Sequence, residues 1–201
     1  MRISLQYTDE DWRRLNFSDE GAWQKAVDML EARITERYFA PVDLLIQAEQ
    51  DLPFGQRRFG FAIMAIDCLL VEMFESFIEG VETSDGQSKQ LFVRFLTTRP
   101  RFREYFSDTL AKRFYSEFRS GIFHQGEVQG DGLVWSVGSL VMELNGRMIV
   151  NRTAFHQALK DEFSDYLTAL REPSQASFEL PFPKIDLREN FRSKMNAICN
   201  R

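Results

Sequence analysis

Apolar residues recur every three or four positions along most of the chain, which is the spacing of amphipathic helices. The clearest helix runs from about Arg57 to Glu79, and Gly80 follows it as a C-cap. Its apolar stripe consists of Phe59, Ile63, Ile66, Leu70, Met73, Phe77 and Val81. The same spacing predicts a long helix from Asp19 to about Gln50, which Pro41 should kink or split.

Further helices follow from the same pattern. One passes through LFVRFL and ends at the Arg99–Pro100 step, because a residue before proline disfavours helix. The next begins near Ser107 and carries apolar residues at Leu110, Phe114, Phe118 and Ile122. The last long helix spans about Thr153 to Arg171. Near the start of the chain, Thr8-x-x-Asp11 predicts a short capped turn with Trp12 facing inward.

Between Leu133 and Val150 the spacing becomes that of strands. Asn145-Gly146 lies within this stretch and is the strongest short signal for a two-residue hairpin turn. We therefore predict a β-hairpin at about 133–150. Trp135 should be at least half buried, because alternating apolar neighbours give the ribbon one face to bury.

The expected fold is a mainly α helical bundle with one inserted β-hairpin. A chain of 201 residues suits one domain. It consists of an N-terminal arm (1–18), the bundle (19–171) and a tail (172–201) that contains Pro173, Pro181 and Pro183. The tail also predicts a short amphipathic helix, which docks on its own chain or on a partner, with apolar residues at Leu187, Phe191, Met195 and Ile198.

The sequence favours a cytoplasmic protein without a membrane partner. The opening residues contain no apolar stretch suited to a signal peptide. The most apolar stretch, 59–81, carries four acidic residues, which a membrane span would not tolerate. Cys68 and Cys199 match no disulfide or metal spacing, so we interpret them as free thiols in a reducing compartment.

The net charge of −5 argues against avid, non-specific binding of nucleic acid. Basic residues nevertheless concentrate between Arg94 and Arg119. They form either an ordinary solvated face or a strip that tracks RNA phosphates. The candidate RNA-binding residues of this strip are Arg99, Arg101, Arg103, Lys112 and Arg113.

Several chemistries lack the residues that they need. Two histidines and two isolated cysteines offer too few ligands for a zinc site. There is no glycine-rich phosphate loop between a strand and a helix, and we expect no cofactor. The acidic face of Glu72, Glu75 and Glu79 could hold Mg²⁺, but a solvated or interfacial face is the favoured interpretation. His156, between Phe155 and Gln157 in the last long helix, is interpreted as structural.

The remaining signal is the pair Arg119 and His124 in the run FYSEFRSGIFHQG. Gly121 lies between the two residues. A glycine inside a helix costs about 1 kcal/mol relative to alanine, so it indicates close approach by another backbone or a ligand.

This run resembles the HEPN superfamily, whose hallmark is an arginine followed by four to six residues and then a histidine near the end of a late helix. LLVEMFESFIEG and LFVRFLTTRPRFREYF precede the motif in the order and spacing of one prokaryotic branch. In that branch a β-hairpin and a closing helix follow the motif. The resemblance covers about residues 58–170.

The resemblance implies a dimeric, metal-independent endoribonuclease of a toxin–antitoxin, abortive-infection or related defence system, with a possible antitoxin as regulatory partner. Arg119 and His124 would be the catalytic pair, and Glu72 would orient one of them. Ser120 stands where the family often has asparagine, which departs from the pattern. Gly126 replaces the tyrosine that nucleotidyltransferase partners modify in some members, so that control is not expected.

The spacing of the pair independently favours a homodimer. Residues five apart on an α-helix point roughly 140° away from each other, so one protomer does not easily aim both side chains at one phosphate unless the helix ends near Gly121. A two-fold axis beside the helix would bring two pairs into one cleft. The alternatives are a non-catalytic HEPN module that binds RNA, a nucleotide or a protein, and a helical interaction domain in which the pair is structural.

Overall fold

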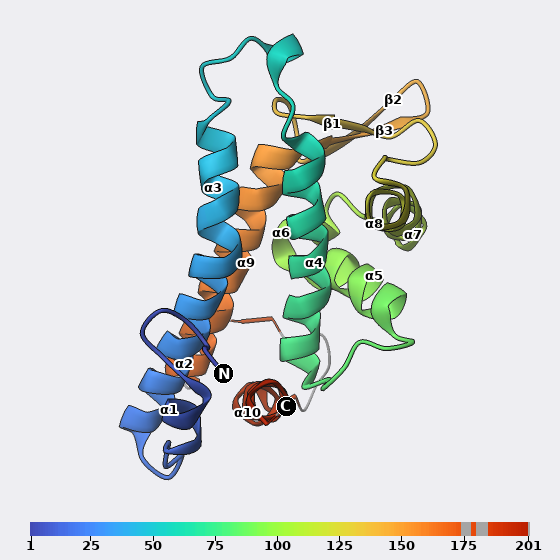
Figure 1. Ribbon diagram of the computed structural model, residues 1–201. Coiled ribbons are helices and arrows are strands. Elements are labelled where there is room, and N and C mark those ends of the chain that lie inside the picture. The colour runs from blue at the N-terminus through green and yellow to red at the C-terminus, as the bar shows by residue number, and fades with distance from the viewer. Residues whose placement is uncertain (174–177, 180–184, 201) are drawn as a thin grey trace.

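The computed structural model describes residues 1–173, 178–179 and 185–200. The chain is mainly helical and carries one small sheet (Figure 1). Its helices include α2 (Glu20–Ile34), α3 (Ala40–Gln47), α4 (Gly60–Glu79) and α9 (Arg152–Arg171). The mainly α fold with a small β insertion, predicted from the hydrophobic pattern, is therefore confirmed.

The helical path from Glu20 to Gln47 contains a π-helical segment, Thr35–Phe39, directly before Pro41. Proline has no N–H to donate, and its ring crowds the carbonyl one turn earlier. The wider π turn accommodates the ring, and the N–H of Ala40 donates to the carbonyl of Thr35. The predicted interruption at Pro41 is thus a local widening of one continuous helix.

Helix α4 lies at the centre of the molecule, against α5 (Ser88–Thr98), α9 and α10 (Leu187–Cys199). Gly80 ends it in the left-handed conformation, with φ of 72°, as predicted. The prediction of a solvated acidic face was wrong for Glu75, which is 0% exposed. Because neighbouring helices cover most of α4, its charged side is partly enclosed.

The helix predicted from Ser107 is present and continues to Gln125. It consists of α7 (Asp108–Phe114), a π-helical segment (Tyr115–Ser120) and α8 (Gly121–Gln125). The hydroxyl of Ser107 accepts from the N–H of Leu110 and caps its start. A short helix, α6 (Pro100–Arg103), precedes it. Phe114 anchors the helix in the core by stacking on the rings of Phe92, Phe118 and Phe155.

The sheet has three strands in the order β1-β3-β2, namely β1 (Leu133–Trp135), β2 (Val141–Leu144) and β3 (Arg147–Asn151). The predicted turn joins β2 to β3, with φ of 52° at Asn145 and 77° at Gly146. The predicted extent of the hairpin was too long, because β1 pairs with β3 in parallel and leaves the hairpin at 141–151. Trp135 is more than half buried, as predicted.

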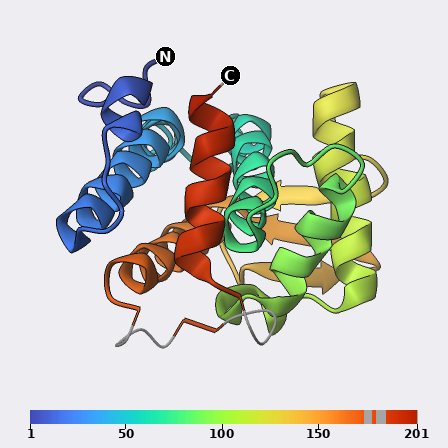
Figure 2. The ribbon, with the colours of Figure 1, turned by 90° about the horizontal axis from the view of Figure 1, so that it is seen from below.

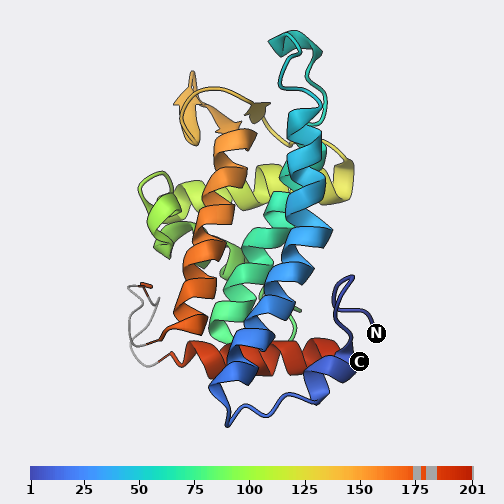
Figure 3. The ribbon, with the colours of Figure 1, turned by 90° about the vertical axis from the view of Figure 1, so that its left-hand side faces the viewer.

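Helix α10 docks on its own chain, across the end of the bundle opposite the sheet (Figures 2 and 3). Phe191 and Met195, on the inner side of α10, are fully buried, which confirms the predicted amphipathic helix. The indole N–H of Trp12 donates to Oδ1 of Asn196 at 2.8 Å. Pro181 and Pro183 of the tail lie outside the described residues.

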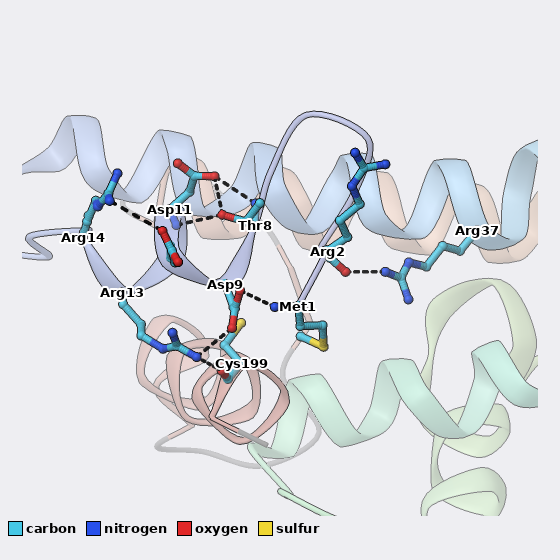
Figure 4. A network of polar contacts seen from close by, with 10 residues as sticks. Met1, Arg2, Thr8, Asp9, Asp11, Arg13, Arg14, Arg37 and Cys199 are labelled. Carbon is cyan, nitrogen blue, oxygen red and sulfur yellow. Dashed lines mark hydrogen bonds and ion pairs between the residues drawn. The ribbon is translucent and has the colours of Figure 1, made fainter.

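The N-terminal arm is tied to α10 by polar contacts (Figure 4). Helix α1 (Asp9–Arg13) begins with the predicted capping box of Thr8 and Asp11. The guanidinium of Arg13 donates both to Oδ2 of Asp9, at 2.7 Å, and to the carbonyl of Cys199, at 2.8 Å. The two ends of the chain therefore lie side by side.

One connected hydrophobic core joins the arm, the helices, the sheet and α10, through residues such as Trp12, Phe74, Met148 and Phe191. The sheet and the terminal helix thus pack into the same interior as the bundle. Of the helices in the described ranges, none has the length and apolar character that crossing a membrane requires.

Candidate functional site

Arg119 lies in the π-helical segment Tyr115–Ser120 and points at α4. Its Nη2 donates to Oε2 of Glu72 at 3.0 Å, and the two side chains are only 20% and 13% exposed. The contact pairs Arg119 with the acidic residue that the sequence singled out. π-helical turns are rare and frequently occur at functional sites.

A small network extends this ion pair. The hydroxyl of Ser88, in α5, donates to the Glu72 carboxylate, and the hydroxyl of Tyr115 donates to Ser88 at 3.3 Å. The guanidinium carbon of Arg119 also lies 5.4 Å from the ring centre of Tyr115 and 5.0 Å from that of Phe123. Groups from three helical segments therefore fix the position of Arg119.

Tyr115 and Phe123 were not predicted as site residues, although their spacing in the sequence indicates that they lie beside Arg119. Tyr115, Arg119 and Phe123 are spaced four residues apart, so their side chains lie on one face of a helix. Ser88 could not be found in this way, because only tertiary packing of α5 against α4 brings it to Glu72.

His124 lies in the last turn of α8, and its side chain is exposed. Within the described part of the chain it makes no hydrogen bond or ion pair, and it does not contact Arg119. The helix continues through Gly121 to Gln125, so it does not end between the two residues. A single protomer thus presents a fixed arginine and an accessible imidazole at separate positions.

Gly121 lies under a returning loop, which confirms the predicted close approach of another backbone. A Cβ at Gly121 would be 2.6 Å from the carbonyl oxygen of Glu127 and 2.8 Å from the amide nitrogen of Gln129. That amide donates to the carbonyl of Glu117 at 2.8 Å. Ser120 is partly buried, with no side-chain hydrogen bond in the described ranges.

The basic strip predicted from the sequence is not a continuous exposed surface. Arg99 is 1% exposed, and its guanidinium lies 5.0 Å from the ring centre of Phe178. Burial lowers the pKa of Arg99, although Glu75 partly offsets the effect. The interpretation of Arg99 as a contact for external phosphates was therefore wrong, because its charge is enclosed.

The other four strip residues each have a carboxylate partner. Arg101 lies 2.6 Å from Asp165, and Lys112 lies 2.6 Å from Asp108. Arg103 pairs with Glu179, and Arg113 pairs with Glu117 and Glu143. These pairs reduce the positive potential of the strip, and the role of the four residues in RNA binding stays a prediction.

The three glutamates at the C-terminal half of α4 have different surroundings. Glu72 pairs with Arg119, Glu79 pairs with Arg94, and both carboxylate oxygens of Glu75 are buried without a hydrogen bond. No group of histidine, cysteine, aspartate and glutamate in the described part of the chain is arranged to hold a metal ion.

His156 lies in the core, away from any surface that a substrate could reach. Its side chain is 2% exposed, and Nδ1 lies 2.7 Å from Oδ1 of Asp67. Burial raises the pKa of Asp67 to about 6, and the contact with His156 partly offsets this effect. Burial likewise raises the pKa of the Cys68 thiol, so this cysteine is not an activated nucleophile.

Comparisons with models of known protein families, with curated proteins and with solved structures find no match for this chain. The function of the protein therefore has to be inferred from the site itself and from the resemblance of its motif.

Proposed function

We propose that this protein is a metal-independent endoribonuclease whose catalytic pair is Arg119 and His124. The observation that carries the proposal is an arginine fixed by Glu72 on the same helix as an exposed histidine, which has no hydrogen bond or ion pair among the described residues. The resemblance to the HEPN superfamily supports the same assignment and suggests a toxin–antitoxin, abortive-infection or related defence system.

RNA carries its own nucleophile, the 2′-hydroxyl, so the protein needs to supply only proton transfer and positive charge. His124 removes the 2′-hydroxyl proton or protonates the leaving 5′-oxygen, each typically worth about 10²–10⁴-fold in rate. Arg119 stabilises the charge that develops on the phosphoryl oxygens. The product of this reaction ends in a 2′,3′-cyclic phosphate. Glu72 is a positioning residue in this proposal, because it holds Arg119 and has no role in proton transfer.

The active form in this proposal is a homodimer. Arg119 and His124 make no hydrogen bond or ion pair with each other among the described residues, and a second copy beside this helix would bring two such pairs into a shared cleft. Two large apolar side chains near the pair support such an interface, because Leu69 on α4 is 37% exposed and Phe123 on α8 is 45% exposed. The proposed interface includes α4 and the helix that carries the pair.

We further propose a cytoplasmic location and regulation by a cognate antitoxin. Cys68 and Cys199 are buried free thiols, a state that suits a reducing compartment.

The second candidate function is a non-catalytic module that binds RNA, a nucleotide or a protein. It is favoured by the Glu72 carboxylate, which compensates the charge of Arg119, and by the net charge of −5. Ser120, which departs from the family pattern, favours it too.

Incubation of the protein with total RNA in the presence of EDTA separates the two functions. The enzyme proposal predicts cleavage by the wild type and by Gln125→Ala, a control at the neighbouring exposed position, and none by His124→Ala. No cleavage of any RNA by the wild type would transfer the support to the binding module. Cleavage that persists in His124→Ala would contradict the assignment of the site.

His156→Ala is also expected to retain activity, since His156 lies apart from the proposed pair. It is a poor control, however, because the change leaves the buried Asp67 without its partner. Any loss of activity in this variant has to be compared with its stability before it is interpreted.

A further inference from the structure

A second site lies at the beginning of α4, beside the sheet. A cavity of about 160 Å³ is lined by Phe54, Arg57, Gly60, Val134, Trp135, Ser136 and Arg152. The loop between α3 and α4, strand β1 and the start of α9 meet at this end of the molecule (Figure 1). Glu72 lies twelve residues further along α4, about 18 Å at the rise of an α-helix, so this cavity is separate from the proposed ribonuclease site.

Arg57 contributes a positive charge that no carboxylate balances within the described residues. Its Nε donates to the carbonyl of Leu52 at 3.0 Å, and its Nη2 donates to that of Gln50 at 3.3 Å. Its Nη1 donates to the hydroxyl of Ser136 at 2.6 Å. All three acceptors are neutral, so the guanidinium is held in place while its charge remains.

Arg152 contributes a second guanidinium to the wall of the cavity. The residue is 3% exposed, and its Nη2 pairs with the buried carboxylate of Glu49. Its Nε is buried without a hydrogen-bond partner. Glu49 also accepts from the backbone amides of Arg58 and Phe59, just before α4. Glu49 thus balances the charge of Arg152, whereas Arg57 makes no ion pair within the described residues.

The remaining walls suit a small ligand. The rings of Trp135 and Phe54 are edge to face, with centres 5.8 Å apart. The Ser136 hydroxyl accepts from Arg57 and keeps its own O–H available to donate. A volume of 160 Å³ corresponds to roughly five waters. An oxyanion beside a guanidinium and a hydroxyl accepts charge-assisted hydrogen bonds, which are stronger than those between neutral groups.

We propose that this cavity binds a small oxyanion, a phosphate or carboxylate group, through Arg57 and Ser136, with the guanidinium of Arg152 in the cavity wall. Two guanidinium groups at one point recognise the oxygens of such a group, and the anion balances the uncompensated charge of Arg57. The ring of Trp135 forms the apolar wall for the remainder of the ligand. This inference does not depend on the proposed ribonuclease activity.

Calorimetric titration of the full chain with inorganic phosphate, and separately with benzoate, at constant ionic strength tests the proposal. Saturable binding of at least one probe with one site per chain is expected. Arg57→Gln should weaken it at least about tenfold, the factor that a hydrogen bond to a charged group contributes. Arg58→Gln removes the same charge from an exposed neighbour outside the cavity and should leave binding unchanged.

Two calorimetric results would overturn the proposal. One is the absence of saturable binding of both probes to the wild type. The other is equal weakening by Arg57→Gln and Arg58→Gln, which would indicate a general charge effect.

A second measurement avoids the risk that Arg57→Gln loosens the loop. The indole N–H resonance of Trp135, identified by its absence in Trp135→Phe, should shift saturably as the bound probe is added to the wild type. The resonances of Trp12 and Trp23 should not shift, because these side chains lie outside the cavity. A Trp135 resonance that does not move at saturating probe would contradict the location.

Discussion

Glu72 makes Arg119 a residue with two roles, one in the proposed chemistry and one in stability. Both side chains are largely buried, so Arg119→Ala leaves the carboxylate without its ion-pair partner. We expect a loss of about 1–3 kcal/mol in the free energy of unfolding, measured by urea denaturation. His124→Ala, at an exposed position, should change this free energy by no more than about 0.5 kcal/mol.

The control for Arg119 is Arg147→Ala, which removes an arginine that is paired 3.8 Å from Asp131 on the surface. That change should be nearly neutral, because exposed ion pairs contribute little. Equal stability of Arg119→Ala and Arg147→Ala would show that the Glu72 contact is not important in the folded protein. If both Arg119→Ala and His124→Ala unfold, the pair is structural.

Glu75 should make stability depend on pH. Burial raises its pKa to about 8 from an ordinary value of 4.5; Arg99 opposes the shift and Glu79 adds to it. The folded state therefore binds a proton that the unfolded state releases between these pH values. The contribution of Glu75 to the free energy of unfolding is therefore fully present below about pH 4.5. It decreases as the pH rises towards 8, by at most roughly 1.4 kcal/mol per pH unit.

Urea unfolding at pH 5 and pH 8 tests this dependence. Glu75→Gln cannot ionise, so it should lose less stability than the wild type between the two pH values. Glu82→Gln changes an exposed carboxylate and should follow the wild type. A Glu75→Gln protein with the same pH dependence as the wild type would contradict the expected ionisation.

The sequence predicted some residue environments and not others, for physical reasons. The close approach of another segment to Gly121 was predicted correctly, because a glycine in the middle of a helix usually indicates such a contact. Glu75 was not, because helical spacing places it between Glu72 and Glu79 on a charged side. Its burial follows from neighbouring helices that pack around α4, and that packing does not depend on the local pattern.

At the scale of elements, the hairpin is the feature whose local cause is clearest. Asn145 and Gly146 both have positive φ, as the tight turn requires. A Cβ on Gly146 would meet nothing within 4 Å, so Gly146→Ala isolates the backbone cost. We expect a loss of about 1–2 kcal/mol in the free energy of unfolding.

The matched control for the turn is Gly55→Ala. A Cβ at Gly55 would also meet nothing within 4 Å, and this glycine does not have positive φ. Gly55→Ala should therefore leave the free energy of unfolding by urea or heat nearly unchanged. A Gly146→Ala protein as stable as Gly55→Ala would show that the turn does not need its left-handed conformation.

The helices were located well from the sequence because most have an apolar period and several have a recognisable cap. Ser107, Gly80 and the Thr8–Asp11 box mark ends that the structure confirms. The parallel pairing of β1 with β3 could not be predicted. Strand spacing identifies extended segments, but it does not say which segments pair or in which direction.

At the scale of the whole molecule, the proposed composite site requires two copies of the chain. Light scattering at tens of micromolar should therefore report a dimer. Leu69→Glu should shift the protein towards monomer, because it places a charge at the exposed leucine of α4, in the proposed interface. Leu144→Glu, at a 50% exposed leucine of the hairpin, should leave the dimer intact. A wild-type protein that is entirely monomeric would count strongly against the shared cleft.

The chemical identity of the cleaved RNA ends tests most sharply whether Arg119 and His124 catalyse attack by the 2′-hydroxyl. A defined RNA is incubated with the protein in EDTA, and phosphorus NMR identifies the new termini. The wild type and Gln125→Ala should produce one fragment that ends in a 2′,3′-cyclic phosphate and one that begins with a 5′-hydroxyl. His124→Ala and Arg119→Ala should produce no new termini. Termini with 3′-hydroxyls and 5′-phosphates, or cyclic phosphates produced equally by His124→Ala, would contradict this mechanism.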